Sequence, residues 1–97
     1  MPAQEWKFDQ SPNTAAITSR QVLEDLLPIL VVIHYDDDHS WAFLCGTTNS
    51  ENDGRVISME EIVRRDPSLH LIADLPPGMK AWRTTTNAPW IREYFKK

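Results

Sequence analysis

The sequence is poor in the residues and segments that mark several large classes of protein. Its 97 residues include one cysteine, Cys45, which excludes an internal disulfide framework and is typical of a reducing, cytoplasmic compartment. No hydrophobic run approaches the ~18 residues that a membrane span requires. Residues 1–13 lack the basic start and apolar stretch of a secretory signal. We therefore expect one cytoplasmic domain without a membrane segment.

Glycine is scarce as well, and this excludes the common nucleotide-binding loops. The three glycines, Gly46, Gly54 and Gly78, are isolated and form neither a P-loop nor a dinucleotide fingerprint. Cys45 follows an alternating segment without a nucleophile motif, which is typical of a buried, inert thiol. The sequence therefore predicts no enzyme, no cofactor and no metal site. A metal- or cysteine-dependent enzyme is the third alternative, to be tested by mutating Cys45 or residues 36–38.

Charge is the most uneven property of the chain. The formal net charge of −4 divides into −7 for residues 1–54 and +3 for residues 55–97. Nucleic acid is disfavoured as a partner because phosphate binding requires clustered Lys and Arg. The asymmetry indicates either an acidic contact surface for a basic partner or two halves that attract each other within one fold.

The spacing of apolar residues predicts a single α+β domain, with a mostly antiparallel sheet and two or three short helices. We expect residues 1–13 to form a polar tail or an edge strand and residues 14–97 to form the domain. A helix is expected from a cap at Thr18 to Leu27, ended by Pro28. Further helices are expected after the caps Ser58 and Asp66. Strands are expected at 29–33, 40–45, 55–57 and 79–84, and the first two form a hairpin. Residues 90–95 are a strand or a short helix, and a strand that pairs with residues 79–83 in a second hairpin is preferred.

The candidate contact residues lie in two polar loops of the acidic half. The turn Asp36, Asp37, Asp38 and His39 joins the first predicted hairpin, and the loop 47–54 carries two further carboxylates. The first explanation of the turn is a solvated connection whose carboxylates prevent aggregation, and a contact surface comes second, ahead of a metal site. Trp41 follows the turn and is either a core residue or an interface anchor. The candidate partner-binding residues are Asp36, Asp37, Asp38, His39, Trp41, Glu51 and Asp53.

A series of short motifs resembles a bacterial family of small uncharacterised domains that are grouped with the immunity proteins of polymorphic toxin systems. The motifs, in order, are W-x-F-L-x-G at 41–46, V-I-S-x-E-E-I at 56–62, D-P-S-L at 66–69, D-L-P-x-G at 74–78, A-W-R at 81–83 and a later Trp90. The resemblance implies a non-catalytic inhibitor that binds a cognate protein toxin, and the acidic half of the chain would favour capture of a basic one. It supplies no catalytic residues. The alternative is a stand-alone interaction or small-ligand-binding module without a toxin partner.

Overall fold

A computed structural model describes residues 6–46 and 53–94, which form an α+β fold built on a six-stranded sheet. The strands are β1 (Ala15–Ser19), β2 (Val31–His34), β3 (Trp41–Leu44), β4 (Gly54–Ser58), β5 (Met79–Trp82) and β6 (Ile91–Tyr94). The helices are α1 (Arg20–Leu23), α2 (Met59–Arg65) and the 3₁₀ helix η2 (Pro67–Ile72).

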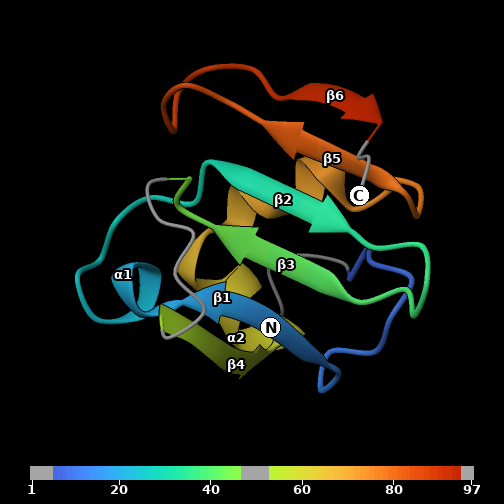
Figure 1. The fold of residues 1–97 in the computed structure, drawn as a ribbon, viewed down its shortest axis with the longest axis horizontal. Helices are drawn as coiled ribbons and strands as arrows, with labels where there is room; N and C mark the ends of the chain where they lie inside the picture. Colours follow the sequence, from blue (N-terminus) through green and yellow to red (C-terminus); the bar gives the residue numbers. More distant parts are fainter. Residues whose placement is uncertain (1–5, 47–52, 95–97) are drawn as a thin grey trace.

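The sheet has the strand order β4-β1-β3-β2-β5-β6. All neighbouring strands are antiparallel except β1 and β3, which run parallel. Helices α2 and η2 both lie behind the sheet in Figure 1, so they cover one of its faces. The predicted fold class, α+β with a mostly antiparallel sheet, is confirmed.

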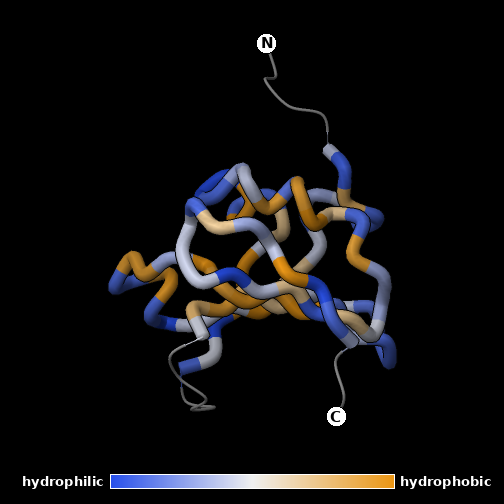
Figure 2. The backbone as a smooth tube through the Cα atoms, turned by 90° about the horizontal axis from the view of Figure 1, so that it is seen from above, coloured by the Kyte–Doolittle hydropathy of each residue, from blue (hydrophilic) through white to orange (hydrophobic). Residues whose placement is uncertain are grey.

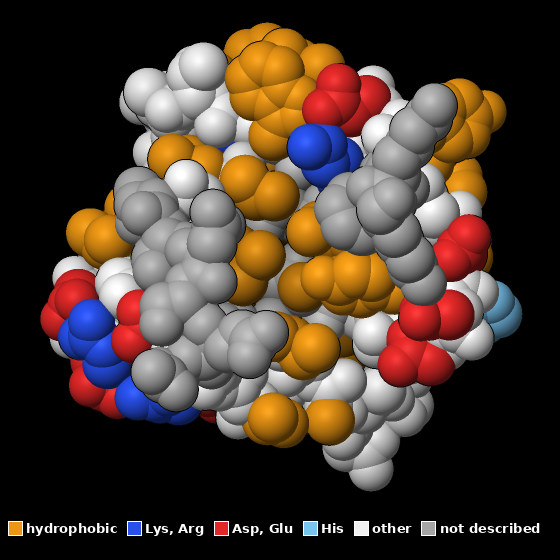
Figure 3. All heavy atoms as spheres, viewed as in Figure 1, with side chains coloured by type: hydrophobic (Ala, Val, Ile, Leu, Met, Phe, Trp, Pro, Cys, Tyr) orange, Lys and Arg blue, Asp and Glu red, His pale blue; other side chains and the backbone are white. Residues whose placement is uncertain are grey.

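The hydrophobic core lies between the sheet and these two helices. Alternate residues of the central strands, among them Val32, Trp41 and Phe43, are buried against Ile62 and Leu69. The alternate residues Ile33 and Ala42 point to the other face and are buried too, as expected for a continuous apolar strand at the centre of a sheet. Figure 3 looks onto that other face, and hydrophobic side chains run across the middle of the part that described residues form.

Both predicted hairpins are confirmed by the strand pairing. Strand β2 pairs with β3, and β5 pairs with β6. The caps of the later helices are also as predicted, since Ser58 accepts from the backbone of Glu61 and Asp66 accepts from the backbone of Ser68. The first strand, β1, was not predicted, because its alternation is short and its parallel partner β3 lies far along the chain.

The helix predicted from Thr18 to Leu27 is wrong at both ends. Ser19 is the cap, and the Thr18 hydroxyl instead donates to the Phe43 carbonyl at 2.6 Å, because Thr18 lies in β1 beside β3. The helix ends at Leu23 rather than at Pro28. Leu26 adopts φ +58°, and the Leu27 N–H donates back to the Gln21 carbonyl at 3.1 Å, which closes the helix early.

The N-terminal segment is neither a tail nor a strand in its described part, residues 6–13. Phe8 is buried and packs edge-on against Trp41 with 5.0 Å between ring centroids. The Gln10 amide donates to the His39 carbonyl. The aromatic side chains that suggested an edge strand therefore fix this segment to the core instead, because burial of large rings is more favourable than one further ladder at a sheet edge.

A buried arginine, Arg83, holds together the loops at the opposite end of the sheet from the β2–β3 turn. Its guanidinium donates to the Ile29 carbonyl at 2.9 Å, to Asp66 at 2.7 Å and to Ser68 at 3.1 Å. It also lies 4.1 Å from the ring centroid of Trp90. Although only 4% exposed, the charge is paired and well hydrogen-bonded, as a buried charge must be.

Candidate functional site

The candidate site is the β2–β3 turn, in which Asp36, Asp37, Asp38 and His39 are all exposed. The turn is held by its own side chains. Asp38 accepts from both the backbone N–H and the hydroxyl of Ser40, at 3.0 and 2.7 Å, and Asp37 accepts from the Asp38 N–H at 3.0 Å. Below them, the Tyr35 N–H donates to the Ser40 carbonyl. The aspartates therefore shape the turn and at the same time present its negative charge to solvent.

A fourth carboxylate, that of Asp9, lies at the same end of the sheet. Its Oδ2 is 3.9 Å from Nε2 of His34, the last residue of β2, and the neighbouring Gln10 binds the carbonyl of His39. We call the four residues Asp9, Asp36, Asp37 and Asp38 the acidic end. Acidic side chains gather at the right of Figure 3, where Figure 1 shows the β2–β3 turn. Sequence reasoning missed Asp9 because no local signal brings residues 9 and 36 together.

The acidic end is supported from inside by stacked rings. His34 lies parallel to Trp41, with 4.0 Å between ring centroids, and its Nδ1 is 2.7 Å from the Leu75 carbonyl. The turn Pro76–Gly78 packs against the outside of Asp36, since a Cβ at Gly78 would lie 3.5 Å from that side chain. These contacts fix the position of the carboxylates before any partner arrives.

Trp41 is not an interface anchor, and this candidate is corrected. Its side chain is 0% exposed, because it shares the helix-covered face of β3 with Phe43. Cross-strand pairing with His34 places it one layer beneath the turn. Its contribution to the site is therefore to support the turn and not to touch a partner.

Asp53, the candidate of the second predicted loop that the structure describes, lies at the other end of the sheet. Asp53 immediately precedes β4, whose first residue Gly54 pairs with Ser19 at the end of β1. Because β1 and β3 are parallel, this is the end at which β3 finishes, away from the turn before Trp41. Glu51 lies outside the described residues. The described members of the predicted contact surface therefore do not form one surface.

Asp53 is moreover engaged by its own chain. It accepts from Gln21 Nε2 at 2.9 Å and from Arg20 Nε at 3.4 Å. The hydrogen bond to Asp53, followed by the charge of Asp25, raises the pKa of the Arg20 guanidinium. Asp53 thus fastens α1 to the start of β4 and presents less charge to a partner than the aspartates of the acidic end.

The thiol considered for catalysis lies in the interior of the described part of the chain. Cys45 is 2% exposed and its sulfur lies 4.0 Å from the Ser19 hydroxyl, as predicted for a buried thiol. Residues 6–46 and 53–94 contain no group of three or more His, Cys, Asp and Glu residues placed to hold a metal ion. None of the described helices is both long and apolar enough to span a bilayer.

Comparisons with protein-family models, with curated proteins and with solved structures find no match to this chain.

Proposed function

We propose that the chain is a non-catalytic binding protein, an immunity-type inhibitor that neutralises a cognate bacterial toxin through direct contact with the acidic end. The observation that carries the proposal is the convergence of Asp9 with Asp36, Asp37 and Asp38 on one exposed end of a fixed scaffold. The motif resemblance given above supports the same function. The partner expected from the charge is a basic protein, such as a nuclease.

The physical advantage of such an end is fast capture. Clustered carboxylates attract a basic surface over distances of about 10 Å at moderate ionic strength, and this raises the association rate more than the final affinity. The turn is already held by Asp38, Ser40 and the stacked His34 and Trp41. Little conformational entropy is then lost on binding, which favours a tight complex.

The experiment is co-expression with the product of the neighbouring gene, followed by purification of the complex. The chain should restore growth and form a stoichiometric complex with a product that is toxic alone. A harmless product, or rescue without a complex, contradicts the proposal. A stable complex with a non-toxic protein instead favours the stand-alone interaction module.

The role of the acidic end is tested by replacing Asp36, Asp37 and Asp38 together by Asn. Asn keeps a side-chain oxygen that accepts the turn hydrogen bonds, so the fold is retained while the charge is lost. We expect the association rate to fall about tenfold at low salt and to lose most of its salt dependence. The matched control replaces Glu60 and Glu93, two exposed acids on α2 and β6 outside the acidic end, by Gln. Equal losses in both variants would contradict an acidic-end contact.

A further inference from the structure

The segment after α1 holds a bulky residue where glycine is normally found. Leu26, two residues after the helix cap Glu24, has φ +58°, and the Leu27 N–H reaches back to the Gln21 carbonyl. Glycine takes this conformation without steric cost, whereas a leucine Cβ crowds its own backbone. The fold therefore accepts strain to keep a side chain at this position.

That side chain is not used inside the molecule. Leu26 is 76% exposed and the adjoining Leu27 is also exposed, so neither gains the burial that would offset the strain. In Figure 2 this hydrophobic stretch reaches the left periphery, at the place where Figure 1 shows the chain leaving α1. Strained residues that the local fold does not require are concentrated at functional sites.

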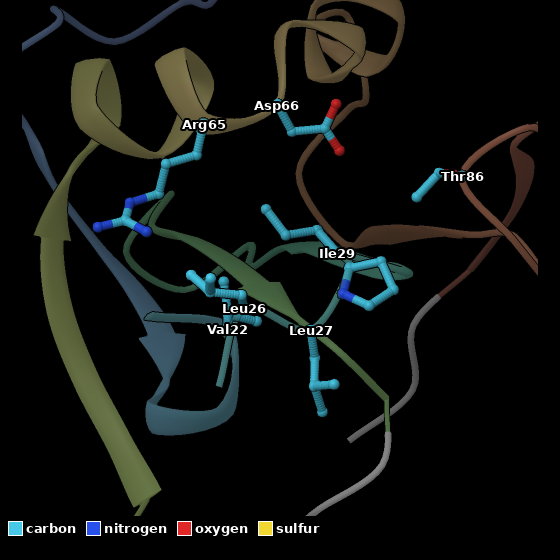
Figure 4. Close-up of a pocket in the computed structure, with 8 residues that line it drawn as sticks. Val22, Leu26, Leu27, Ile29, Arg65, Asp66 and Thr86 are labelled. Carbon is cyan, nitrogen blue, oxygen red and sulfur yellow. The ribbon is translucent and has the colours of Figure 1, made fainter. Parts of the chain in front are cut away.

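The two leucines form part of the wall of a groove of about 450 Å³. Val22, Pro28 and Ile29 complete its apolar lining, and Arg65, Asp66 and Thr86 supply its polar lining. Figure 4 shows that the Arg65 side chain extends from the end of α2 on the same side of the groove as Val22 and Leu26. Arg65 is partly exposed and lies 3.7 Å from its acidic neighbour Glu61, so its charge remains accessible to an incoming carboxylate.

The same surface carries the carboxylates that would match this cation. Glu24 and Asp25 directly precede the leucines and are both exposed. Their present partners are the partly exposed Arg55 at 3.7 Å and Arg20 at 3.3 Å, which are weak surface pairs. One patch thus contains a protruding apolar side chain, an apolar groove, anions and a cation. A surface that contains both halves of a contact can pair with a copy of itself across a two-fold axis.

We propose that two copies of this chain associate through the patch, with Leu26 of each copy seated in the groove of the other and Asp25 facing Arg65 of the second copy. The patch lies at the end of the sheet opposite to the β2–β3 turn, because α1 follows β1 at the end where β3 finishes. The dimer leaves both acidic ends open. The dimer proposal does not rest on the proposed function, since the patch and the acidic end share no residues.

The first experiment measures the mass of the full chain by sedimentation equilibrium over a wide concentration range. We expect a reversible monomer–dimer equilibrium. Leu26→Gly and Leu26→Asp should each weaken it about tenfold or more, because an anchor side chain is lost from the centre of a small interface. The matched control is Leu71→Asp, at a leucine on η2 that is 70% exposed and lies outside the groove. That variant should dimerise like the original chain.

Two readouts separate loss of the interface from loss of the fold. Leu26→Gly should unfold at the same or a higher temperature in dilute solution, since glycine relieves the left-handed strain. Asp25→Lys and Arg65→Glu should each weaken the dimer, and the two together in one chain should restore it by exchanging the charges. A chain that stays monomeric at every concentration, a Leu26 variant that dimerises normally, or a double variant no better than the single variants would overturn the proposal.

Discussion

The two ends of the sheet are closed by different means. At the groove end, the guanidinium of Arg83 ties β5 to the carbonyl of Ile29 and to Asp66 and Ser68 at the start of η2. At the turn end, the N-terminal segment is held by Phe8, which packs against Trp41 and lies 5.7 Å from the His70 ring centroid. One closure is polar and the other is aromatic.

The difference also separates what each end presents to solvent. Where a buried charge links the loops, the apolar Leu26 and Leu27 are exposed among charged side chains of both signs. Where rings fill the interior, the exposed side chains of the acidic end are carboxylates. Among the described residues, each end holds one non-glycine residue with positive φ, Leu26 or His39. The two ends therefore suit different partners, a second copy of the chain at one end and a basic protein at the other.

Removing the polar closure should have the largest effect. Arg83→Leu leaves the Asp66 carboxylate and the Ile29 carbonyl without their buried donor, so the free energy of unfolding should fall by about 3–5 kcal/mol. Arg83→Lys keeps the charge but cannot reach all these acceptors. Its free energy of unfolding should therefore lie between those of the wild type and of Arg83→Leu. Urea unfolding followed by tryptophan fluorescence measures both. Wild-type stability for Arg83→Leu would mean that the hydrogen-bond cluster contributes nothing net.

Removing the aromatic closure should have a somewhat smaller effect. Phe8→Ala vacates a buried position between Trp41 and His70 and should destabilise the fold by about 3 kcal/mol. Phe8→Leu fills most of that volume and should cost less than about 1.5 kcal/mol. The same unfolding measurement applies, with amide exchange of Glu60, whose N–H donates to the Pro12 carbonyl, reporting whether the segment has detached. An alanine variant with unchanged stability and exchange would show that the segment is not docked in solution.

The two residues with positive φ give a smaller and opposite effect. Leu26→Gly should raise the stability of the dilute chain by about 1 kcal/mol, since the left-handed conformation is costly for a residue with a Cβ. His39→Gly should raise it less, because histidine is among the residues that tolerate this region better. Parallel thermal unfolding of both variants decides the order. A loss of stability in Leu26→Gly would show that its side chain packs within the single chain.

The parts of this fold that the sequence could predict depend on local signals. The alternation of Trp41, Phe43 and Cys45, and the caps Ser58 and Asp66, are decided by neighbouring residues, and the structure has them as predicted. The direction in which Trp41 points is also local, yet its burial depends on the helices that cover that face. The sequence alone therefore leaves two alternatives for Trp41, a core position and an interface anchor.

The rest depends on contacts between distant segments, which leave no local pattern. Strand β1 is defined by its neighbours β3 and β4, and Asp9 reaches the acidic end only because Phe8 is buried. The separation of Asp53 from the turn follows from the parallel pairing of β1 with β3, which spacing alone does not specify. The early end of α1 has no sequence signal, because the left-handed position after the helix holds Leu26 and not the glycine that usually marks such an end.

The smallest effect on stability is expected for the exposed ion pair of Arg92 and Asp74, which contrasts with the buried pair of Arg83 and Asp66. Arg92 donates to Asp74 at 2.7 Å, and this hydrogen bond lowers the pKa of the Asp74 carboxyl below its ordinary value. A lowered pKa in the folded state means that the pair stabilises the fold above the unfolded-state pKa, and that this contribution is lost as the pH falls through the folded-state pKa. Arg92→Met should let the pKa of Asp74 rise, as seen by NMR titration of its carboxyl carbon. Because both side chains are exposed, the stability above that pH should fall by less than about 1 kcal/mol. An equal loss in Arg92→Met and Arg83→Leu would remove the distinction between a buried closure and a surface ion pair.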